Sequence, residues 1–393
     1  MLKIYYDMLY LSACGVNNIK PSEKCLDAYR TENKEKSELF NLSCKHFLDT
    51  LIGMTLQKSG VSVSAKWNEN ISKSIRKTIL FNAERSKLLA FMEKQGIWHM
   101  SLKGIILKDF YPDASMRQMS DNDILFDSEY ADTVKKYMLS NGYKEISSGK
   151  GNHDVYKKPP VYNFELHRSL YGFSHKEGWK EYYSNIYERL IQDGNSIYSF
   201  HMTDEDFYIY ITSHAYKHYS RCGTGIRTLL DFYVYLKEKK SSLNFSYIQS
   251  ECEKLGISEF ETESRKLCEK VFSPDFIKKY QPEKSENIFS DDEKKMLMYY
   301  FESRVYGNLK NAIEKNFSRY GNSSKPKYIF RRLFPDKNYY NKIPLLNKYK
   351  ILIPFFWLYR IGRAVFSKRR RKFISIEINF LKKTKSSGKN KKG

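Results

Sequence analysis

Two aspartates lead into a short apolar stretch near the middle of the first half of the chain, and this pattern constrains the fold more than any other. The run reads Asp121-Asn-Asp123-Ile-Leu-Phe126, and its apolar residues predict a strand over 122–126. Side chains alternate between the two faces of a strand, so Asp121 and Asp123 should point the same way, about 7 Å apart. The sequence therefore predicts a sheet with two carboxylates on one face.

Paired carboxylates at this spacing are typical of a site for a hard divalent cation. Mg²⁺ keeps several of its waters and is usually held by one or two carboxylates together with substrate phosphates. Lys103-Gly104 precedes the pair, and a glycine at a helix start lets the backbone approach a phosphate that the lysine would neutralise. An ordinary turn is the alternative interpretation of Lys103-Gly104. Phosphoryl or nucleotidyl transfer is the chemistry that this arrangement favours.

These residues belong to a longer pattern along the chain. Its elements are Leu102-Lys103-Gly104, Tyr111-Pro112, Arg117, Asp121-Asn-Asp123 and Phe164-Glu165-Leu166-His167. The pattern resembles the nucleotidyltransferase superfamily with the DNA-polymerase-β-type catalytic core, specifically its uncharacterised bacterial branch. The resemblance continues through 214–231 and Pro354-Phe-Phe-Trp357, and so covers most of the chain. Two departures are Ile105, where the wider superfamily has a small residue, and Asn122, where it has an apolar one.

The resemblance implies an activity and a set of catalytic residues. The activity is transfer of a nucleoside monophosphate from an NTP to an acceptor hydroxyl, with Mg²⁺ or Mn²⁺ as the cofactor. Asp121 and Asp123 would hold the cations, and Glu165 would supply the third carboxylate. His167 follows Glu165 by two residues on the same strand face, so we expect it to hydrogen-bond that carboxylate.

Several basic residues are candidates for binding the nucleotide phosphates. Arg117 stands four residues before Asp121, and its fork-shaped guanidinium suits either phosphate oxygens or Asp121 itself. Both interpretations remain open at this point. The resemblance places a helical region with Asp231 opposite the catalytic core. The nucleotide- and phosphate-binding candidates are Lys103, Gly104, Arg117, Lys217 and Arg227.

The predicted fold class is α+β, with a small mixed β-sheet nucleotidyltransferase core flanked by helical N- and C-terminal regions. We expect strands near 97–102, 122–126, 153–157 and 161–167, with helices over 105–110 and 130–141. Capping patterns at Thr203-Asp-Glu-Asp206 and Ser290-Asp-Asp-Glu293 predict further helix starts, the second helix reaching about 316. Five regions follow: helical 1–95, catalytic core 96–170, a helical domain facing the core 171–320, a basic and aromatic region 321–385, and a disordered tail 386–393.

Charge and cysteine content limit the location and the partners. The formal net charge is +23, from 68 Lys and Arg against 45 Asp and Glu, so the surface should attract polyanions such as RNA, nucleotides or anionic lipid. The acceptor remains open among RNA, protein and small molecules. The six cysteines form neither a zinc-ligand pattern nor a disulfide framework, which favours the cytoplasm. No run of 18 apolar residues predicts a spanning helix.

The C-terminal third contains an apolar, aromatic stretch beside a basic one. Residues 351–360 are followed by Arg363 and by Lys368-Arg-Arg-Arg-Lys372, which suits peripheral contact with an anionic membrane or a buried helix with a basic end. We favour the buried helix. Two alternatives to catalysis are a basic RNA- or membrane-surface-binding module whose aspartates are relics, and an accessory of surface-glycan assembly at the membrane.

Overall fold

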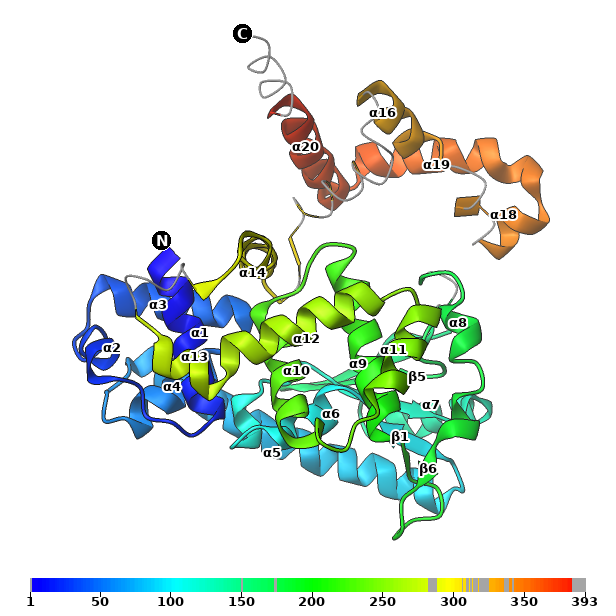
Figure 1. Cartoon of the computed structure of the whole chain (residues 1–393). Coiled ribbons are helices and arrows are strands. Elements are labelled where there is room, and N and C mark those ends of the chain that lie inside the picture. The colour runs from blue at the N-terminus through cyan, green and yellow to red at the C-terminus, as the bar shows by residue number, and fades with distance from the viewer. Residues whose placement is uncertain are drawn as a thin grey trace. The chain divides into compact units, whose positions relative to one another are not determined.

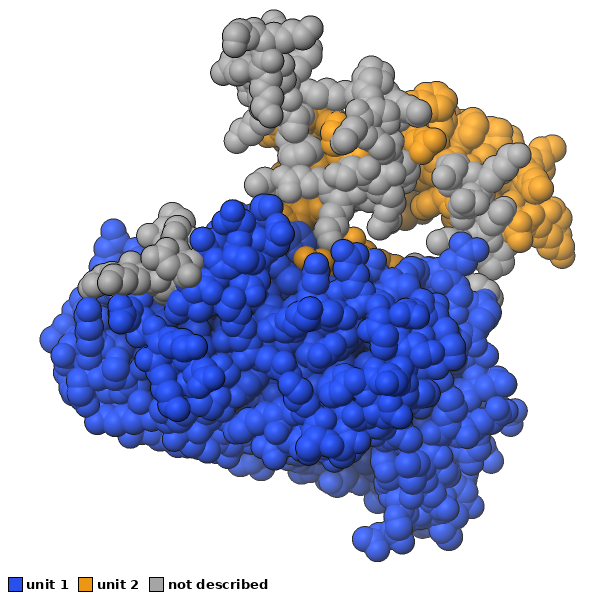
Figure 2. Space-filling model, in the orientation of Figure 1, with its two compact units in different colours: residues 1–217, 225–305 blue, residues 218–224, 306–393 orange. Residues whose placement is uncertain are grey.

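The computed structural model describes residues 2–149, 151–172, 175–281 and 288–305, and in the C-terminal part 307–308, 311, 313, 317, 325–335, 339–340 and 343–383. The chain divides into two compact units. Unit 1 comprises Met1–Lys217 and Gly225–Val305, and unit 2 comprises His218–Thr224 and Tyr306–Gly393 (Figure 2). The predicted tail 386–393 lies outside the described residues.

The N-terminal region is helical, as the sequence predicted. Local capping fixes several of its helix starts, because Asn33 accepts from the amide of Lys36 and Ser64 from that of Trp67. The longest helix ends just before Gly96, whose φ of +70° stops it. The helices are α1 (Leu2–Val16), α2 (Glu23–Asp27), α3 (Lys34–His46), α4 (Asp49–Lys58) and α5 (Ala65–Lys94) (Figure 1).

A five-stranded mixed sheet follows and confirms the α+β prediction. Its strands are β1 (His99–Ser101), β2 (Asn122–Phe126), β3 (Lys144–Ser147), β4 (His153–Lys158) and β5 (Tyr162–His167). Their order is β1-β2-β5-β4-β3. The β2–β5 pair is parallel and the other neighbours are antiparallel. The sequence did not predict β3, because this edge strand is largely exposed and has no buried alternating residues.

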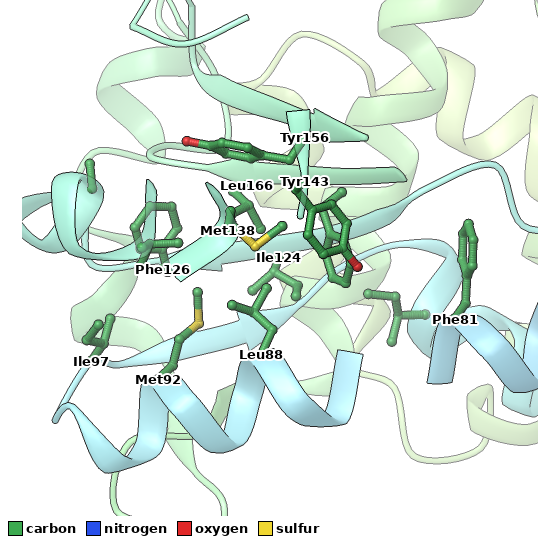
Figure 3. Close-up of a cluster of buried hydrophobic side chains, with 14 of the residues drawn as sticks. Phe81, Leu88, Met92, Ile97, Ile124, Phe126, Met138, Tyr143, Tyr156 and Leu166 are labelled. Atoms are coloured by element: carbon green, nitrogen blue, oxygen red, sulfur yellow. The ribbon is translucent and has the colours of Figure 1, made fainter. Parts of the chain in front are cut away.

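Short helices connect the strands. Between β1 and β2 the chain forms α6 (Gly104–Leu107) and the 3-10 turns η1 (Lys108–Phe110) and η2 (Ala114–Met116), and between β2 and β3 it forms η3 (Ser128–Tyr130) and α7 (Ala131–Ser140). The apolar face of the sheet packs against both α5 and α7, with Leu88 and Met92 from α5 against Ile124 and Leu166 (Figure 3). Because side chains alternate along a strand, Asp123 and Glu165 must then lie on the opposite face.

Asn122 lies on the packed face of β2, where the wider superfamily has an apolar residue. The Asn122 side chain is fully buried. Its Nδ2 donates to the Phe81 carbonyl at 3.5 Å, and its Oδ1 accepts from Arg85 Nη1 at 3.2 Å. A buried amide is tolerated when it is hydrogen-bonded, so this departure ties β2 to α5 and leaves the carboxylate face unchanged.

Helices dominate after the sheet. The described elements are α8 (Trp179–Tyr182), η4 (Ile186–Arg189), the hairpin β6 (Ile191–Gln192) and β7 (Phe200–His201), α9 (Asp204–Tyr219), α10 (Ile226–Lys239), α11 (Phe245–Lys254), α12 (Ser258–Phe272), α13 (Pro274–Lys279) and α14 (Asp291–Ser303). The predicted capping box at Ser290 and Glu293 is present. The predicted extension of this helix to 316 is wrong, because Arg304 takes a φ of 58° and ends the helix.

The C-terminal helices lie in unit 2 and include α16 (Lys325–Leu333), α18 (Pro344–Lys348), α19 (Ile353–Phe366) and α20 (Lys368–Lys383), with the turn η6 (Lys350–Leu352). No residue of α19 is buried, so the expectation of a buried helix is wrong here. Among the described residues, no helix is both long and apolar enough to cross a membrane. The exposed large apolar side chains of η6 and α19 are Ile351, Phe355, Leu358, Tyr359, Ile361, Val365 and Phe366.

Candidate active site

Strand register places two of the predicted carboxylates side by side. Asp123 on β2 is directly opposite Glu165 on β5 in the parallel pair, and directly opposed side chains share a face of the sheet. Asp121 lies just before β2, at the end of the strand where Asp123 lies. Asp121 lies near enough to Asp123 and Glu165 for both charges to raise its pKa. We call these three carboxylates the acidic cluster, of which Asp123 and Glu165 lie on the sheet face away from α5.

Asp123 is the most firmly held of the three. Its Oδ1 accepts from Lys103 Nζ at 2.6 Å and from His167 Nε2 at 2.8 Å. Burial alone would raise the pKa of Asp123, but the Lys103 ammonium and the His167 ring hold it well below its usual range. The expected hydrogen bond from His167 to Glu165 is therefore replaced by one to Asp123, because His167 reaches diagonally across to β2.

Asp121 carries the opposite perturbation. Burial, and then the negative charges of Asp123 and Glu165, raise the pKa of Asp121 to about 7. Burial and Asp123 likewise raise the pKa of Glu165. Three oxygen donors whose charges repel one another in a partly closed site are a donor set that suits a hard divalent cation, since bound positive charge would relieve the repulsion.

The raised pKa of Asp121 gives the cation-free protein a pH-dependent stability. The folded state binds this proton more tightly than the unfolded chain, whose aspartates titrate near about 3.9. The resulting stabilisation is fully present below about pH 4 and is lost as the pH rises through about 7. We expect Asp121→Asn to remove this loss. In urea unfolding with EDTA, the free energy of unfolding of the variant should therefore rise relative to that of the wild type between about pH 5 and about pH 8. A stability difference that does not change with pH would contradict this assignment.

Two predicted basic residues lie beside the carboxylates. The charges of Lys103 and Arg227 both act to lower the pKa of Asp121. Arg227, on α10, donates from Nη1 to the Gln118 carbonyl at 3.0 Å and lies over the Phe47 ring, 5.1 Å from its centroid. Burial, and then the neighbouring Arg117 charge, lower the pKa of Arg227. A buried guanidinium next to another positive charge is stabilised when a phosphate binds to it.

Lys103 and Arg227 form a positive rim beside the acidic cluster, and two further lysines extend it. Lys217 on α9 acts electrostatically on Glu165, and its Nζ lies 6.0 Å from the Tyr171 ring centroid. Lys77 on α5 lies near enough to Asp121 for that charge to raise its pKa, although burial lowers it overall. Sequence reasoning missed Lys77, because α5 has the pattern of a packing helix. The available clue was its place four residues before Phe81, a buried α5 residue that packs on the sheet.

Arg117 pairs with Asp231 rather than with Asp121. Its Nε and Nη2 donate to the Asp231 carboxylate at 2.7 and 2.9 Å, and the Tyr111 hydroxyl donates to the same carboxylate at 2.8 Å. Arg117 and Asp231 are both buried. The guanidinium fork is thus engaged in a buried ion pair that ties the segment before β2 to α10, in place of the predicted pairing with Asp121. Its predicted contact with phosphate oxygens stays a prediction.

The same ion pair explains Gly104. A Cβ on Gly104 would lie 2.3 Å from Arg117 Nη1 and 2.9 Å from Met119 Sδ. Lys103, immediately before it, has a φ of 45°, an uncommon value for a residue with a side chain that is often found at functional sites. Close packing against Arg117 therefore accounts for this glycine, and the predicted approach of its backbone to a phosphate stays a prediction.

Gly104→Ala is expected to destabilise the protein by about 1–3 kcal/mol, the usual cost of overpacking. The added methyl group must displace Arg117, which is fixed at both ends of its fork by Asp231. Gly194→Ala is the matched control, because a Cβ there meets nothing within 4 Å. Chemical denaturation of the two variants measures the difference in stability. Equal denaturation midpoints would show that Arg117 can move aside for the methyl group without a cost in stability.

His153 is a site residue that sequence reasoning missed. It lies directly opposite His167 in the antiparallel β4–β5 pair, with the two ring centroids 5.0 Å apart. His153 Nε2 lies 3.8 Å from Glu165 Oε2. Burial, and then the Lys103 charge, lower the pKa of His153, and the same causes lower that of His167 to about 4. The place of His153 in the site follows from the register of β4 against β5. Sequence composition does not predict that register.

The chain belongs to a family of nucleotidyltransferases. Residues 32–273, more than half of the chain, match the family described as uncharacterised nucleotidyltransferase. This span begins just before α3, ends just after α12, and contains the whole sheet with its acidic cluster and positive rim. No curated protein and no solved structure matches the chain.

Proposed function

We propose that this protein transfers a nucleoside monophosphate from an NTP to an acceptor hydroxyl in a reaction that depends on a divalent cation and releases pyrophosphate. The observation that supports this most strongly is the parallel register of Asp123 with Glu165, beside Asp121. Family membership supports nucleotidyl transfer in general. Further support comes from Asp121, which lies just before β2 near both carboxylates, and from the positive side chains near the acidic cluster.

Asp121, Asp123 and Glu165 are the residues that would hold the cation. A divalent cation bound there would supply neutralising charge for the transferring phosphate and would lower the pKa of the acceptor hydroxyl. Mg²⁺ and Mn²⁺ both accept such carboxylate ligands. Lys103 would keep Asp123 ionised and oriented, since its Nζ donates to Oδ1 at 2.6 Å.

The side chains around the cluster would bind and orient the two substrates. Lys77, Lys103, Lys217 and Arg227 supply positive charge for the triphosphate, which electrostatically favours the pentavalent phosphorus as charge moves to the leaving group. In the reaction, the acceptor oxygen bonds to the α-phosphorus while the bond from that phosphorus to the bridging oxygen breaks and pyrophosphate leaves. Glu165 is the carboxylate that would take the acceptor proton, because its raised pKa favours proton transfer closer to neutral pH.

Labelled nucleotides test the reaction and name the acceptor class. The purified protein is incubated with each NTP, labelled at either the α- or the γ-phosphate, together with Mg²⁺ or Mn²⁺ and a nuclease-free cell extract. We expect α-label, and no γ-label, to enter one fraction among RNA, protein and small molecules. An Asp121→Asn, Asp123→Asn double variant should transfer none. Incorporation of γ-label instead would point to phosphoryl transfer, and no incorporation together with no NTP binding would favour a non-catalytic binding module.

We also propose that the C-terminal unit contacts an anionic membrane surface. The exposed apolar face of α19 includes Phe355 at 67% and Phe366 at 85% exposure. The basic run 368–372 follows this face directly in the sequence. Apolar and aromatic side chains next to clustered Lys and Arg are the combination that holds a helix at the surface of anionic lipid.

Sedimentation with liposomes tests this contact. The full-length protein should sediment with phosphatidylserine-containing vesicles and much less with neutral ones, because each basic residue near the surface contributes about 1 kcal/mol. Phe355→Ser with Phe366→Ser should reduce sedimentation, whereas the same change at Ile197, an apolar residue of unit 1 with 67% exposure, should not. Equal binding of the two variants would exclude α19 as the contact.

A further inference from the structure

The face of β4 and β5 that carries Glu165 also carries two histidines. His153 and His167 are directly opposed across the β4–β5 pair, and Glu165 precedes His167 by two residues. Both relations place the three side chains on the same face of the sheet. One nitrogen of each ring and one Glu165 oxygen all lie within 4.8 Å of one another.

The hydrogen bonding of His167 leaves one ring nitrogen for a ligand. Asp123 can only accept, so His167 Nε2 must carry the hydrogen that it donates at 2.8 Å. The lone pair of the neutral ring is then on Nδ1. Within the part of the chain that the structure describes, this buried Nδ1 has no hydrogen-bond partner. In His153 the nitrogen that approaches Glu165 is Nε2. His167 itself is only 3% exposed, so its unpaired nitrogen is costly unless something binds it.

A histidine that donates one N–H to a carboxylate while its other nitrogen lacks a partner has the arrangement of a metal-ligating histidine. Two imidazoles and one carboxylate, with further positions left to water or substrate, are a ligand set typical of catalytic transition-metal sites. Solvent can enter from one side, because the Glu165 and His153 side chains are 25% and 33% exposed. Mg²⁺, by contrast, strongly prefers oxygen ligands.

We propose that His153, Glu165 and His167 form a cation site that takes a first-row transition metal in preference to Mg²⁺. Two ligands of one tetrahedral ion, each about 2.1 Å from it, lie about 3.4 Å apart. His153 Nε2 and Glu165 Oε2 are 3.8 Å apart, so this pair needs only a small inward movement. The ligand atom of His167 lies within 4.8 Å of theirs and would have to move in with them. Glu165 also belongs to the acidic cluster, which places this ion next to the proposed transfer site.

The binding of this ion does not depend on the proposed function, but its role in transfer does. If nucleotidyl transfer occurs, the site would make the reaction respond to Mn²⁺, Co²⁺ or Zn²⁺ at concentrations far below those of Mg²⁺. If transfer does not occur, the ion would still bind. Binding and activity therefore have to be measured separately.

Co²⁺ titration of the full-length protein tests the site. One equivalent should produce the visible absorption bands of Co²⁺ with nitrogen ligands, and a large excess of Mg²⁺ should not remove them. His153→Gln should weaken Co²⁺ binding at least about tenfold, since changing even an outer partner of a metal ligand costs about 10–100-fold. His201→Gln is the matched control, because His201 is exposed and pairs with Asp193 away from the sheet face. Asp121→Asn should keep the bands.

X-ray absorption of the Co²⁺-loaded wild type gives a second measurement that needs no variant, and imidazole scattering is the expected result. Absence of imidazole scattering, displacement by equimolar Mg²⁺, or unchanged binding in His153→Gln would each overturn the proposed site. If any of these occurs while Mg²⁺ still supports transfer of α-label, the site fails and the proposed function stands. Co²⁺ bands without any transfer or NTP binding would instead overturn the proposed function alone.

Discussion

Asp121→Asn is expected to reduce nucleotidyl transfer by at least about a hundredfold and, at the same time, to stabilise the cation-free protein at neutral pH and above. The loss of activity follows from removing one charged group from a preorganised site, for which about 10²–10³-fold is typical. The gain in stability follows because Asp121 is repelled by Asp123 and Glu165, which together with burial raise its pKa to about 7. Few substitutions improve a fold while abolishing its activity, and those that do so usually lie in active sites.

Two measurements check this prediction. Transfer of α-label measures activity, and the thermal midpoint in EDTA at about pH 8, where the wild-type carboxylate is ionised, measures stability. Asp132→Asn on the exposed side of α7 makes the same chemical change away from the site, and should alter neither quantity appreciably. A destabilised but active Asp121→Asn protein would mean that Asp121 has a structural role only.

Arg117→Met is expected to destabilise the protein by about 3–5 kcal/mol, the usual cost of leaving one partner of a buried ion pair alone. Asp231 would lose both guanidinium donors and keep only the Tyr111 hydroxyl. Urea unfolding in EDTA, without nucleotide, measures the effect. The result also separates a structural role in the Asp231 pair from the phosphate-binding role that the sequence left open, because a phosphate ligand could be removed with little effect on the free protein.

The matched control for Arg117→Met is Arg30→Met. Arg30 Nε pairs with Asp27 at 2.9 Å, but both side chains are exposed, so its loss should cost at most about 1 kcal/mol. Adding Asp231→Leu to Arg117→Met should recover part of the stability, because it removes the unpaired buried charge. If Arg117→Met unfolds like the wild type but binds NTP weakly, Arg117 would be a phosphate ligand and the buried pair unimportant.

Local patterns predicted much of the fold. The strand at 122–126 coincides with β2, and the capping box at Ser290 fixes the start of α14. These features depend on a few neighbouring residues, such as apolar runs and hydroxyl caps. The exposed strand β3 and the end of α14 at Ser303 were not predicted, because an edge strand needs no apolar face and a backbone turn at Arg304 has no strong sequence pattern.

The site was predictable to the extent that it depends on strand alternation. The common face of Asp123 and Glu165 follows from their positions once the two strands pair in register. The partners of the long side chains did not follow, because these depend on which distant elements meet. Arg117 finds Asp231 on α10, 114 residues away, and His153 joins the site only through the pairing of β4 with β5.

The most direct test of the account is binding of a non-transferable NTP analogue to the purified protein, because it requires no knowledge of the acceptor. Calorimetric titration with an α,β-methylene NTP is carried out with and without Mg²⁺ or Mn²⁺, on the wild type and on Asp121→Asn, Asp123→Asn. The account predicts saturable binding that requires the cation and is lost in the double variant. Absence of binding by the wild type, or equal binding by both proteins without any cation, would contradict the conclusion that this carboxylate face is a nucleotidyl-transfer site.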